Sequence, residues 1–264
     1  GVNMLWLRII SAIIGIPLWL GIIYKGGLWL AVATSVLIII GTYEFKVMLA
    51  KKNIKVLLVP VIIGELLFIY GSLNNWSYWF SFGMGISLLI ILVLTIIKYP
   101  NLKLEDIAIN IFMLIYIGWS LTHIVLLRNI FMGNLILIYL FAIIWSTDTG
   151  AYFAGRFFGK KKLAPLVSPK KTVEGSIGGL IFSTFVAFLF NTFVHIFSSQ
   201  FLIISALTIS IMGQIGDLVE SSFKRFVDVK DSGKIIPGHG GILDRFDSTI
   251  ISAPVLFYLI LFFR

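Results

Sequence analysis

The chain contains a succession of apolar stretches that are long enough to cross a lipid bilayer. A membrane-spanning helix needs about 20 mostly apolar residues. We predict such helices over residues 9–24, 28–43, 56–70, 78–97, 107–127, 134–158, 173–197, 201–223 and 246–263. A water-soluble core could not bury so much apolar surface, since 59% of the residues are hydrophobic and only 12% are charged. The sequence therefore predicts an all-α polytopic membrane protein with nine transmembrane helices.

The basic residues indicate how these helices are oriented. Cytoplasmic loops of membrane proteins collect lysine and arginine, and a cytoplasmic N-terminus places 18 of the 21 basic residues on that side. The other three are Lys25, Arg128 and Arg264. We therefore expect a cytoplasmic N-terminus and a C-terminus on the opposite side. The net charge of +9 is explained by this topology, and no nucleic acid partner is expected.

Residues that can perform chemistry are concentrated in the second half of the chain. Eight of the 12 acidic residues lie between Asp148 and Asp247. We therefore divide the chain into a scaffold of helices, residues 1–133, which also offers lipid access, and a catalytic part, residues 134–264. The chain has no cysteine, which excludes thiolate metal sites and cysteine nucleophiles.

Polar side chains share one face at the end of the stretch 201–223. They are Asp217, Glu220, Ser221 and Lys224, at i, i+3, i+4 and i+7. Because a carboxylate at the bilayer centre costs about 2.5–3.5 kcal/mol, such groups usually face a polar cavity or a partner. An ordinary ion pair at the membrane surface is the alternative interpretation.

Asp148 is the only charged residue between Asn134 and Gly155. A lone carboxylate in a membrane span favours a functional role. Small residues follow it at steps of four, at Ala151, Gly155 and Gly159, and this spacing favours close packing of helices.

The loop before the stretch 173–197 contains two basic clusters. Lys160–Lys162 is interpreted as an anchor at the membrane surface. In the second cluster, Ser168 and Pro169 predict the N-cap and first residue of a helix, next to Lys170 and Lys171. A helix N-terminus with lysines suits an anion such as phosphate. A capped helix with solvated lysines is equally compatible with this segment.

The last loop, residues 230–247, is dense in functional residue types. It contains four glycines, Pro237 and His239, and it ends with Asp244 and Asp247 on the opening turn of the last helix. Glycine allows the backbone to approach a ligand closely. Carboxylates without thiolates or paired histidines favour a hard cation such as Mg²⁺, and Mg²⁺ beside lysine and arginine is typical of phosphoryl or nucleotidyl transfer.

Residues 155–160 lack the Ser/Thr and the spacing of a Walker loop, which excludes a P-loop NTPase.

The segment from Ser221 to Asp247 resembles the signature of the integral-membrane phosphatidate cytidylyltransferases, also called CDP-diacylglycerol synthases. The matching residues are Ser221-Ser222-Phe223-Lys224-Arg225, Lys230-Asp231, Gly233, Ile236-Pro237, His239-Gly240-Gly241 and Asp244-Arg245-Phe246-Asp247. Residues 148–159 and 168–175 also resemble regions shared by that family. The resemblance covers roughly residues 140–260, whereas the first five helices match only in hydropathy.

The resemblance implies the reaction of CTP with phosphatidate to give CDP-diacylglycerol and pyrophosphate, for phospholipid biosynthesis. It implies Mg²⁺ at one or two divalent-cation sites, with room for a second cation of unknown identity. It also implies an integral protein of the plasma membrane of a bacterial-type cell, with the active site facing the cytoplasm. The resemblance is compatible with a monomer or with a homodimer.

The residues of this implied site fall into three groups. The catalytic residues are Asp217, Asp244, Lys171 and Lys224. The residues that bind substrate phosphates are Ser168, Lys170, Lys171, Thr172, Ser221, Lys224, Arg225, Lys230, His239, Gly240, Gly241 and Arg245. The metal ligands are Asp217 and Asp244, with Asp148, Glu220 and Asp247 as lesser candidates.

Two other functions are alternatives to cytidylyl transfer. A CDP-alcohol phosphotransferase would carry a D-G-x-x-A-R motif, which is absent. A transporter or channel with an intramembrane acidic ion path is the alternative from a different class. It would explain the acidic residues in the membrane, but it gives no reason for the 27-residue signature.

Overall fold

The computed structural model describes residues 2–233, 235 and 240–263, with side chains described from residue 13 onward. The contacts divide the chain into two compact units. Unit 1 comprises the residues up to Phe131 together with Phe226–Arg245, and unit 2 comprises Met132–Arg225 together with the residues from Phe246 onward.

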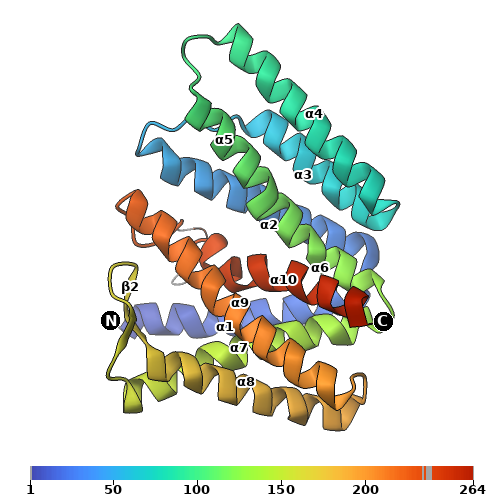
Figure 1. The fold of residues 1–264 in the computed structure, drawn as a ribbon, viewed down its shortest axis with the longest axis vertical. Coiled ribbons are helices and arrows are strands. Elements are labelled where there is room, and N and C mark those ends of the chain that lie inside the picture. Colours follow the sequence, from blue (N-terminus) through green and yellow to red (C-terminus); the bar gives the residue numbers. More distant parts are fainter. Residues whose placement is uncertain (1, 234, 236–239, 264) are drawn as a thin grey trace. The chain divides into compact units, whose positions relative to one another are not determined.

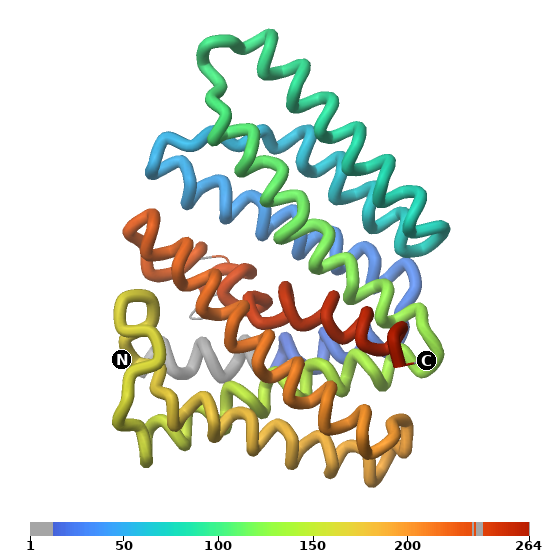
Figure 2. Tube along the Cα trace, viewed as in Figure 1, coloured from blue at the N-terminus to red at the C-terminus, as the bar shows by residue number. Residues whose placement is uncertain are grey.

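Unit 1 is built from the N-terminal helices (Figure 1). They are α1 (Val2–Lys25), α2 (Gly27–Ala50), α3 (Leu58–Leu73), α4 (Trp76–Ile97), α5 (Leu104–Met113), the π-helical turn η1 (Leu114–Trp119) and α6 (Ser120–Asn129). α3 and α4 run side by side as a hairpin in Figures 1 and 2. The two backbones approach closely, because a Cβ on Gly83 of α4 would lie only 3.1 Å from the Gly64 carbonyl oxygen of α3.

The core of unit 1 is apolar but contains a buried glutamate that contacts a neighbouring helix. Glu65 of α3 is fully buried, and its Oε1 accepts a hydrogen bond of 2.7 Å from the Thr42 hydroxyl of α2. Gly118 lies in the π-helical turn, where an added Cβ would be 2.5 Å from Glu65 Cγ. α5, η1 and α6 follow one another without a break, so the turn makes room for Glu65 inside one continuous span.

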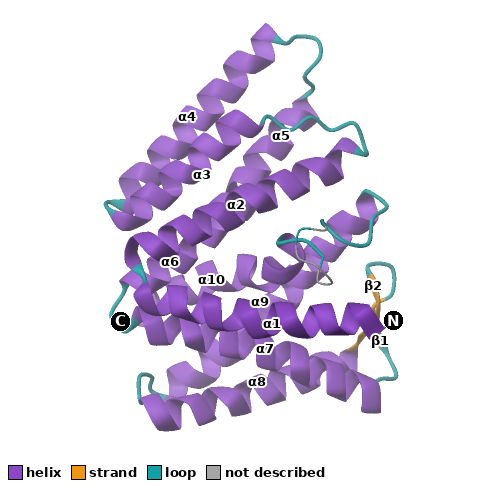
Figure 3. Cartoon of the chain, turned by 180° about the vertical axis from the view of Figure 1, so that it is seen from behind, coloured by secondary structure: helices purple, strands orange, loops and turns teal. Residues whose placement is uncertain are grey.

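Unit 2 contains α7 (Gly133–Phe158), the strands β1 (Lys162–Ala164) and β2 (Ser168–Thr172), α8 (Val173–Val194), most of α9 (Ser199–Phe226) and most of α10 (Leu243–Phe263). α7 and α8 lie side by side (Figures 1 and 3). A Cβ on Gly175 of α8 would be 2.8 Å from the Ala151 carbonyl oxygen, and one on Gly155 of α7 would be 3.0 Å from Thr172 Oγ1. This confirms the prediction that the small residues of α7 allow close helix packing.

Each of the nine predicted apolar stretches coincides with a helix among the described residues. Seven helices are long and apolar enough to span a membrane. α3, Leu58–Leu73, is a shorter apolar helix, and the part of α1 with described side chains, Ile13–Lys25, is apolar as well. Large apolar side chains also face outward; Leu89 is 58% exposed and Ile181 67% exposed. Such a surface is costly in water but suits hydrocarbon. The protein is therefore an all-α polytopic membrane protein.

The predicted start of α8 at Ser168 and Pro169 is wrong. Ser168 begins strand β2, which pairs antiparallel with β1 so that Ala164 faces Ser168 and Lys162 faces Thr172. The residue before a proline is driven toward extended conformations, and a proline is tolerated in a sheet of two edge strands. The N-cap of α8 is Thr172, whose Oγ1 accepts a hydrogen bond of 3.1 Å from the Gly175 N–H. Figure 3 shows this hairpin in orange.

Candidate active site

Unit 2 contains a cavity of about 460 Å³ that is lined by charged residues from three elements. α7 contributes Asp148, Tyr152 and Arg156, β2 contributes Lys170 and Lys171, and α9 contributes Gln214 and Asp217. Thr172, Gly175 and Ser176 complete the wall at the start of α8. The cavity therefore combines anionic and cationic groups, which suits a ligand that carries phosphates and is accompanied by a cation.

The α7 wall of the cavity follows from helical spacing. Asp148, Tyr152 and Arg156 are four residues apart, so they lie on one face of the helix. Arg156 Nη1 donates a hydrogen bond of 3.0 Å to the Tyr152 hydroxyl oxygen. This contact holds the guanidinium at the end of α7, where it can reach an anion.

The hairpin is fixed to the beginning of α8 by Glu174. Its carboxylate accepts hydrogen bonds from the backbone N–H of Lys160 at 3.0 Å and of Lys161 at 3.2 Å. The Val173 N–H also donates to the Lys161 carbonyl at 2.9 Å. Because both ends of the hairpin are attached here, the position of Lys170 and Lys171 on β2 is defined. The tube in Figure 2 shows the hairpin between α7 and α8.

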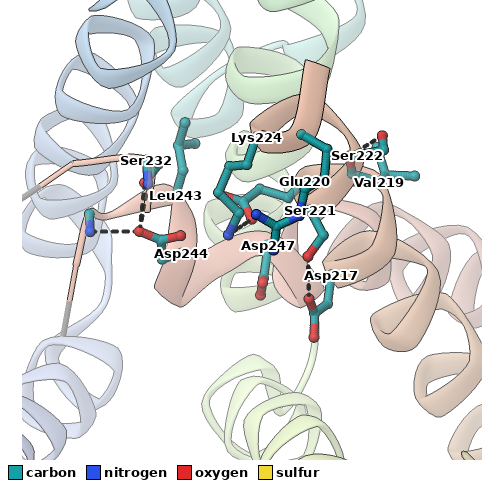
Figure 4. A network of polar contacts seen from close by, with 12 residues as sticks. Asp217, Val219, Glu220, Ser221, Ser222, Lys224, Ser232, Leu243, Asp244 and Asp247 are labelled. Carbon is teal, nitrogen blue, oxygen red and sulfur yellow. Dashed lines mark hydrogen bonds and ion pairs between the residues drawn. The ribbon is translucent and has the colours of Figure 1, made fainter. Parts of the chain in front are cut away.

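Lys171 and Asp217 meet in the cavity. Lys171 Nζ lies 2.5 Å from Asp217 Oδ2, and the two side chains are 27% and 30% exposed. The Ser221 hydroxyl, one turn further along α9, donates a hydrogen bond of 3.2 Å to Asp217 Oδ1 (Figure 4). The carboxylate is thus oriented by one cation and one hydroxyl, and it remains accessible from the cavity.

A second ion pair of α9 is buried. Lys224 forms an ion pair with Glu220, and their side chains are 11% and 1% exposed. The Asp247 side chain of α10 lies near this pair and near Asp217 in Figure 4. α9 and α10 are close here, because a Cβ on Gly216 would lie 2.5 Å from the Asp247 carbonyl oxygen. Glu220 thus pairs with Lys224, as in the alternative interpretation of this face, whereas Asp217 pairs with Lys171. A functional role for the whole face stays a prediction.

Asp244 lies in unit 1, where it holds the glycine loop. Its Oδ2 accepts hydrogen bonds from the Ser232 N–H at 2.9 Å, the Ser232 hydroxyl at 2.9 Å and the Gly241 N–H at 2.8 Å (Figure 4). Gly240 has a positive φ of 85°, and a Cβ there would be 2.7 Å from the same oxygen. In this structure Asp244 therefore organises the loop, and its predicted role as a metal ligand stays a prediction.

The remaining predicted residues lie in several places. Arg225 Nε donates to the Val167 carbonyl at 3.2 Å, next to the hairpin. Ser168 is a strand residue paired with Ala164, and Lys230 and Arg245 are exposed residues of unit 1. His239 lies outside the described residues. The structure thus brings together Asp148, Lys170, Lys171, Thr172 and Asp217 around one cavity.

The donor groups at the cavity fit Mg²⁺. Among residues 2–233, 235 and 240–263, no group of three or more His, Asp or Glu side chains is arranged to hold a metal ion. Mg²⁺, however, is usually bound by one or two carboxylates together with substrate phosphates rather than by an all-protein cage. Asp217 and Asp148 are two carboxylates that line the cavity.

Glu44 of α2 is not among the site residues predicted from the sequence. It is 3% exposed, and its carboxylate accepts hydrogen bonds from the backbone N–H groups of Ile242 and Leu243. An acidic residue at the end of an apolar stretch was the available signal, by the same reasoning that singled out Asp148.

Comparison with known proteins gives the family. The profile of the Cytidylyltransferase family matches residues 6–263. The chain belongs to this cytidylyltransferase family. It is 35% identical over 266 residues to the phosphatidate cytidylyltransferase of Bacillus subtilis, with 97% of each chain covered. It is 37% identical over 260 residues to that of Staphylococcus saprophyticus and 38% to that of Staphylococcus aureus strain COL, with 96% of this chain and 98% of each relative covered.

Membership in the cytidylyltransferase family confirms the resemblance read from residues 221–247 and extends it to the N-terminal helices. The match begins at residue 6, so the helices of unit 1 belong to the family's common architecture. These relatives are named as transferases, which gives no support to the transporter alternative.

Proposed function

We propose that this protein is a phosphatidate cytidylyltransferase, which joins CTP and phosphatidate to form CDP-diacylglycerol and pyrophosphate. A phosphate oxygen of phosphatidate attacks the α-phosphorus of CTP, and a new P–O bond forms. The bond between the α-phosphorus and the oxygen that bridges to the β-phosphorus breaks, and pyrophosphate leaves with its electron pair. The attacking phosphate is already ionised near neutral pH, so the step needs no strong general base.

The observation that carries this proposal is the cavity in which Lys171 and Asp217 meet. It supplies what the reaction requires, namely cations to bring two anions together and a carboxylate that can hold a metal ion. The names of the relatives, matched over nearly their whole length, support the choice of CTP and phosphatidate.

The charges of the substrates explain why the cavity is lined by basic residues. Phosphatidate carries about −1.5 to −2 and CTP carries more, so about −5 to −6 must meet. Two like charges about 4 Å apart repel by about 4 kcal/mol at an effective dielectric constant of about 20. Lys170, Lys171 and Arg156 line the cavity and would offset this repulsion.

Mg²⁺ is the proposed cofactor. Asp217 would hold it, with Asp148 as a second carboxylate at the cavity and Asp247 nearby. When bound, Mg²⁺ neutralises charge on the substrate phosphates. Lys171 has a separate role beside Mg²⁺. Its ammonium orients the Asp217 carboxylate and attracts phosphate oxygens.

The reaction can be tested with the purified protein in detergent. With phosphatidate, CTP and Mg²⁺, we expect CDP-diacylglycerol and pyrophosphate in equal amounts, and EDTA should stop the formation of both. A folded preparation that forms no CDP-lipid but moves ions across liposome membranes would instead support a transporter.

We further propose that the hairpin and the loop after α9 face the cytoplasm, in the plasma membrane of a bacterial cell. The distribution of lysine and arginine supports this orientation, and cysteine labelling tests it because the chain has no native cysteine. Cysteines at the exposed positions Leu166 and Asp231 should react with an impermeant maleimide only from the cytoplasmic side of oriented vesicles.

A cysteine at Asn75 is the control for this labelling. Asn75 is exposed at the start of α4, in a loop predicted to lie on the opposite side, so it should react only from outside. Labelling of Leu166→Cys from outside would overturn the proposed orientation.

A further inference from the structure

Glu44 of α2 binds the backbone at the start of α10, almost 200 residues away in the chain. Its Oε1 accepts a hydrogen bond of 3.0 Å from the Ile242 N–H, and its Oε2 accepts one of 3.1 Å from the Leu243 N–H. The Ser232 hydroxyl lies 3.3 Å from Oε2. All of these residues belong to unit 1.

These contacts give α10 an N-terminal cap from another helix. The first N–H groups of a helix have no acceptor within the helix, and the helix dipole favours a negative charge at that end. α10 begins at Leu243, so the carboxylate of Glu44 satisfies N–H groups at the start of the helix. A capping side chain usually comes from the adjacent residues, whereas here it comes from the N-terminal part of the chain.

The glycines of the loop are shaped by Glu44. A Cβ on Gly241 would lie 2.5 Å from Glu44 Oε2, and a Cβ on Gly233 would clash with Oε1. Only glycine lets the backbone pass this close to the carboxylate. Close contacts within unit 1, with Glu44 and at Gly241 also with Ser232, therefore account for glycine at these two positions of the signature.

The same loop is held from its other side by Asp244. The Ser232 hydroxyl has one proton to donate and lies 2.9 Å from Asp244 Oδ2, closer than to Glu44. The N–H groups of Ser232 and Gly241 also bind Asp244, whereas those of Ile242 and Leu243 bind Glu44. The two carboxylates thus divide the donors of the loop between them.

We propose that Glu44 is a positioning residue for the reaction. By fixing the first turn of α10, it would set where Asp244, a predicted metal ligand, lies within unit 1. Glu44 itself needs no contact with substrate. This inference rests on the proposed function, since it assigns Glu44 a role in that reaction.

The variant Glu44→Gln tests this role. It keeps the shape of the side chain but replaces one acceptor oxygen by an NH₂ group, which cannot accept from a backbone N–H. Hydrogen exchange at the amides of Ile242 and Leu243 should accelerate about tenfold or more, because hydrogen bonds to charged groups are the stronger ones. The kcat per folded protein should fall about 100-fold, since a displacement of about 1 Å can have this effect. The KM for CTP should stay within about threefold, because the cavity lining is unchanged.

Glu65→Gln is the matched control. Glu65 is the other fully buried glutamate of unit 1, and glutamine keeps an acceptor for the Thr42 hydroxyl. Its kcat should remain within about twofold of wild type. If Glu44→Gln does not fold, Glu44→Asp is tested in its place. Aspartate keeps the charge but is one methylene shorter, so we expect a loss of kcat between those of wild type and Glu44→Gln.

Two results would overturn the inference. Unchanged exchange at Ile242 and Leu243 would show that Glu44 does not hold the loop. Faster exchange with a kcat equal to that of Glu65→Gln would show that Glu44 stabilises the loop without positioning anything for the reaction. If the wild type forms no CDP-lipid, the proposed function fails and the positioning role with it, whereas the exchange measurement still decides whether the contact exists.

Discussion

Asp217→Asn is expected to lower turnover by about 10³-fold, because it removes the charge that would hold Mg²⁺ and that orients Lys171. The substitution keeps the volume of the side chain. Since that side chain is 30% exposed, the melting temperature should change by only a few degrees. Turnover with CTP and phosphatidate, measured beside thermal unfolding in detergent, checks both expectations.

Asp228→Asn is the control for this substitution. Asp228 is an exposed aspartate that, like Asp217, forms an ion pair with a lysine. Lys52 Nζ lies 2.8 Å from its Oδ2. The hydrogen bond from the Lys52 ammonium holds the pKa of Asp228 below its usual value, so the Asp228 carboxylate is ionised at neutral pH. Its turnover should stay near that of wild type. Near-normal turnover of Asp217→Asn would show that this carboxylate has been misassigned.

Lys171→Met is expected to lower kcat/KM by about 10²-fold or more, because methionine keeps the length of the side chain but removes the positive charge offered to phosphates. Residues that act as one unit are not additive. The double variant with Asp217→Asn should therefore lose about as much as the worse single variant, which steady-state kinetics can measure.

Lys161→Met, on the same hairpin, is the control for the loss of a lysine. Lys161 is exposed and does not line the cavity, so kcat/KM should remain within about twofold of wild type. Losses that multiply in the double variant of Lys171 and Asp217 would contradict a shared role.

The helices could be predicted from the sequence because hydrophobicity and length determine them. Each of the nine predicted stretches coincides with helical residues, although α3 is shorter than a typical span. The hairpin could not be predicted in the same way. Ser168 and Pro169 occur both at helix starts and in extended segments, and the pairing of β1 with β2 depends on contacts that the local sequence does not specify.

The site was predicted in part. Helical spacing placed Asp217, Glu220, Ser221 and Lys224 on one face, and a lone charge in an apolar span drew attention to Asp148. The meeting of Lys171 with Asp217 is a contact between distant segments, and its pairing could not be read from spacing.

Glu44 was missed for a physical reason. The density of charge is highest after residue 147, where the predicted site residues lie, whereas a capping residue needs only one charge in the right place. Its partners are backbone N–H groups, which no pattern of side chains reveals. Treating each acidic residue of an apolar stretch as a candidate would have identified both Glu44 and Glu65.

The most direct test of the account follows the phosphorus atoms of CTP. CTP labelled at the α-phosphorus and, separately, at the γ-phosphorus is incubated with phosphatidate and Mg²⁺, using wild type and Asp217→Asn. We predict that wild type transfers the α label to the lipid and releases the γ label as pyrophosphate, and that Asp217→Asn does neither at a comparable rate. Transfer of the γ label to lipid, or equal transfer of the α label by both proteins, would contradict cytidylyl transfer at the cavity of Lys171 and Asp217.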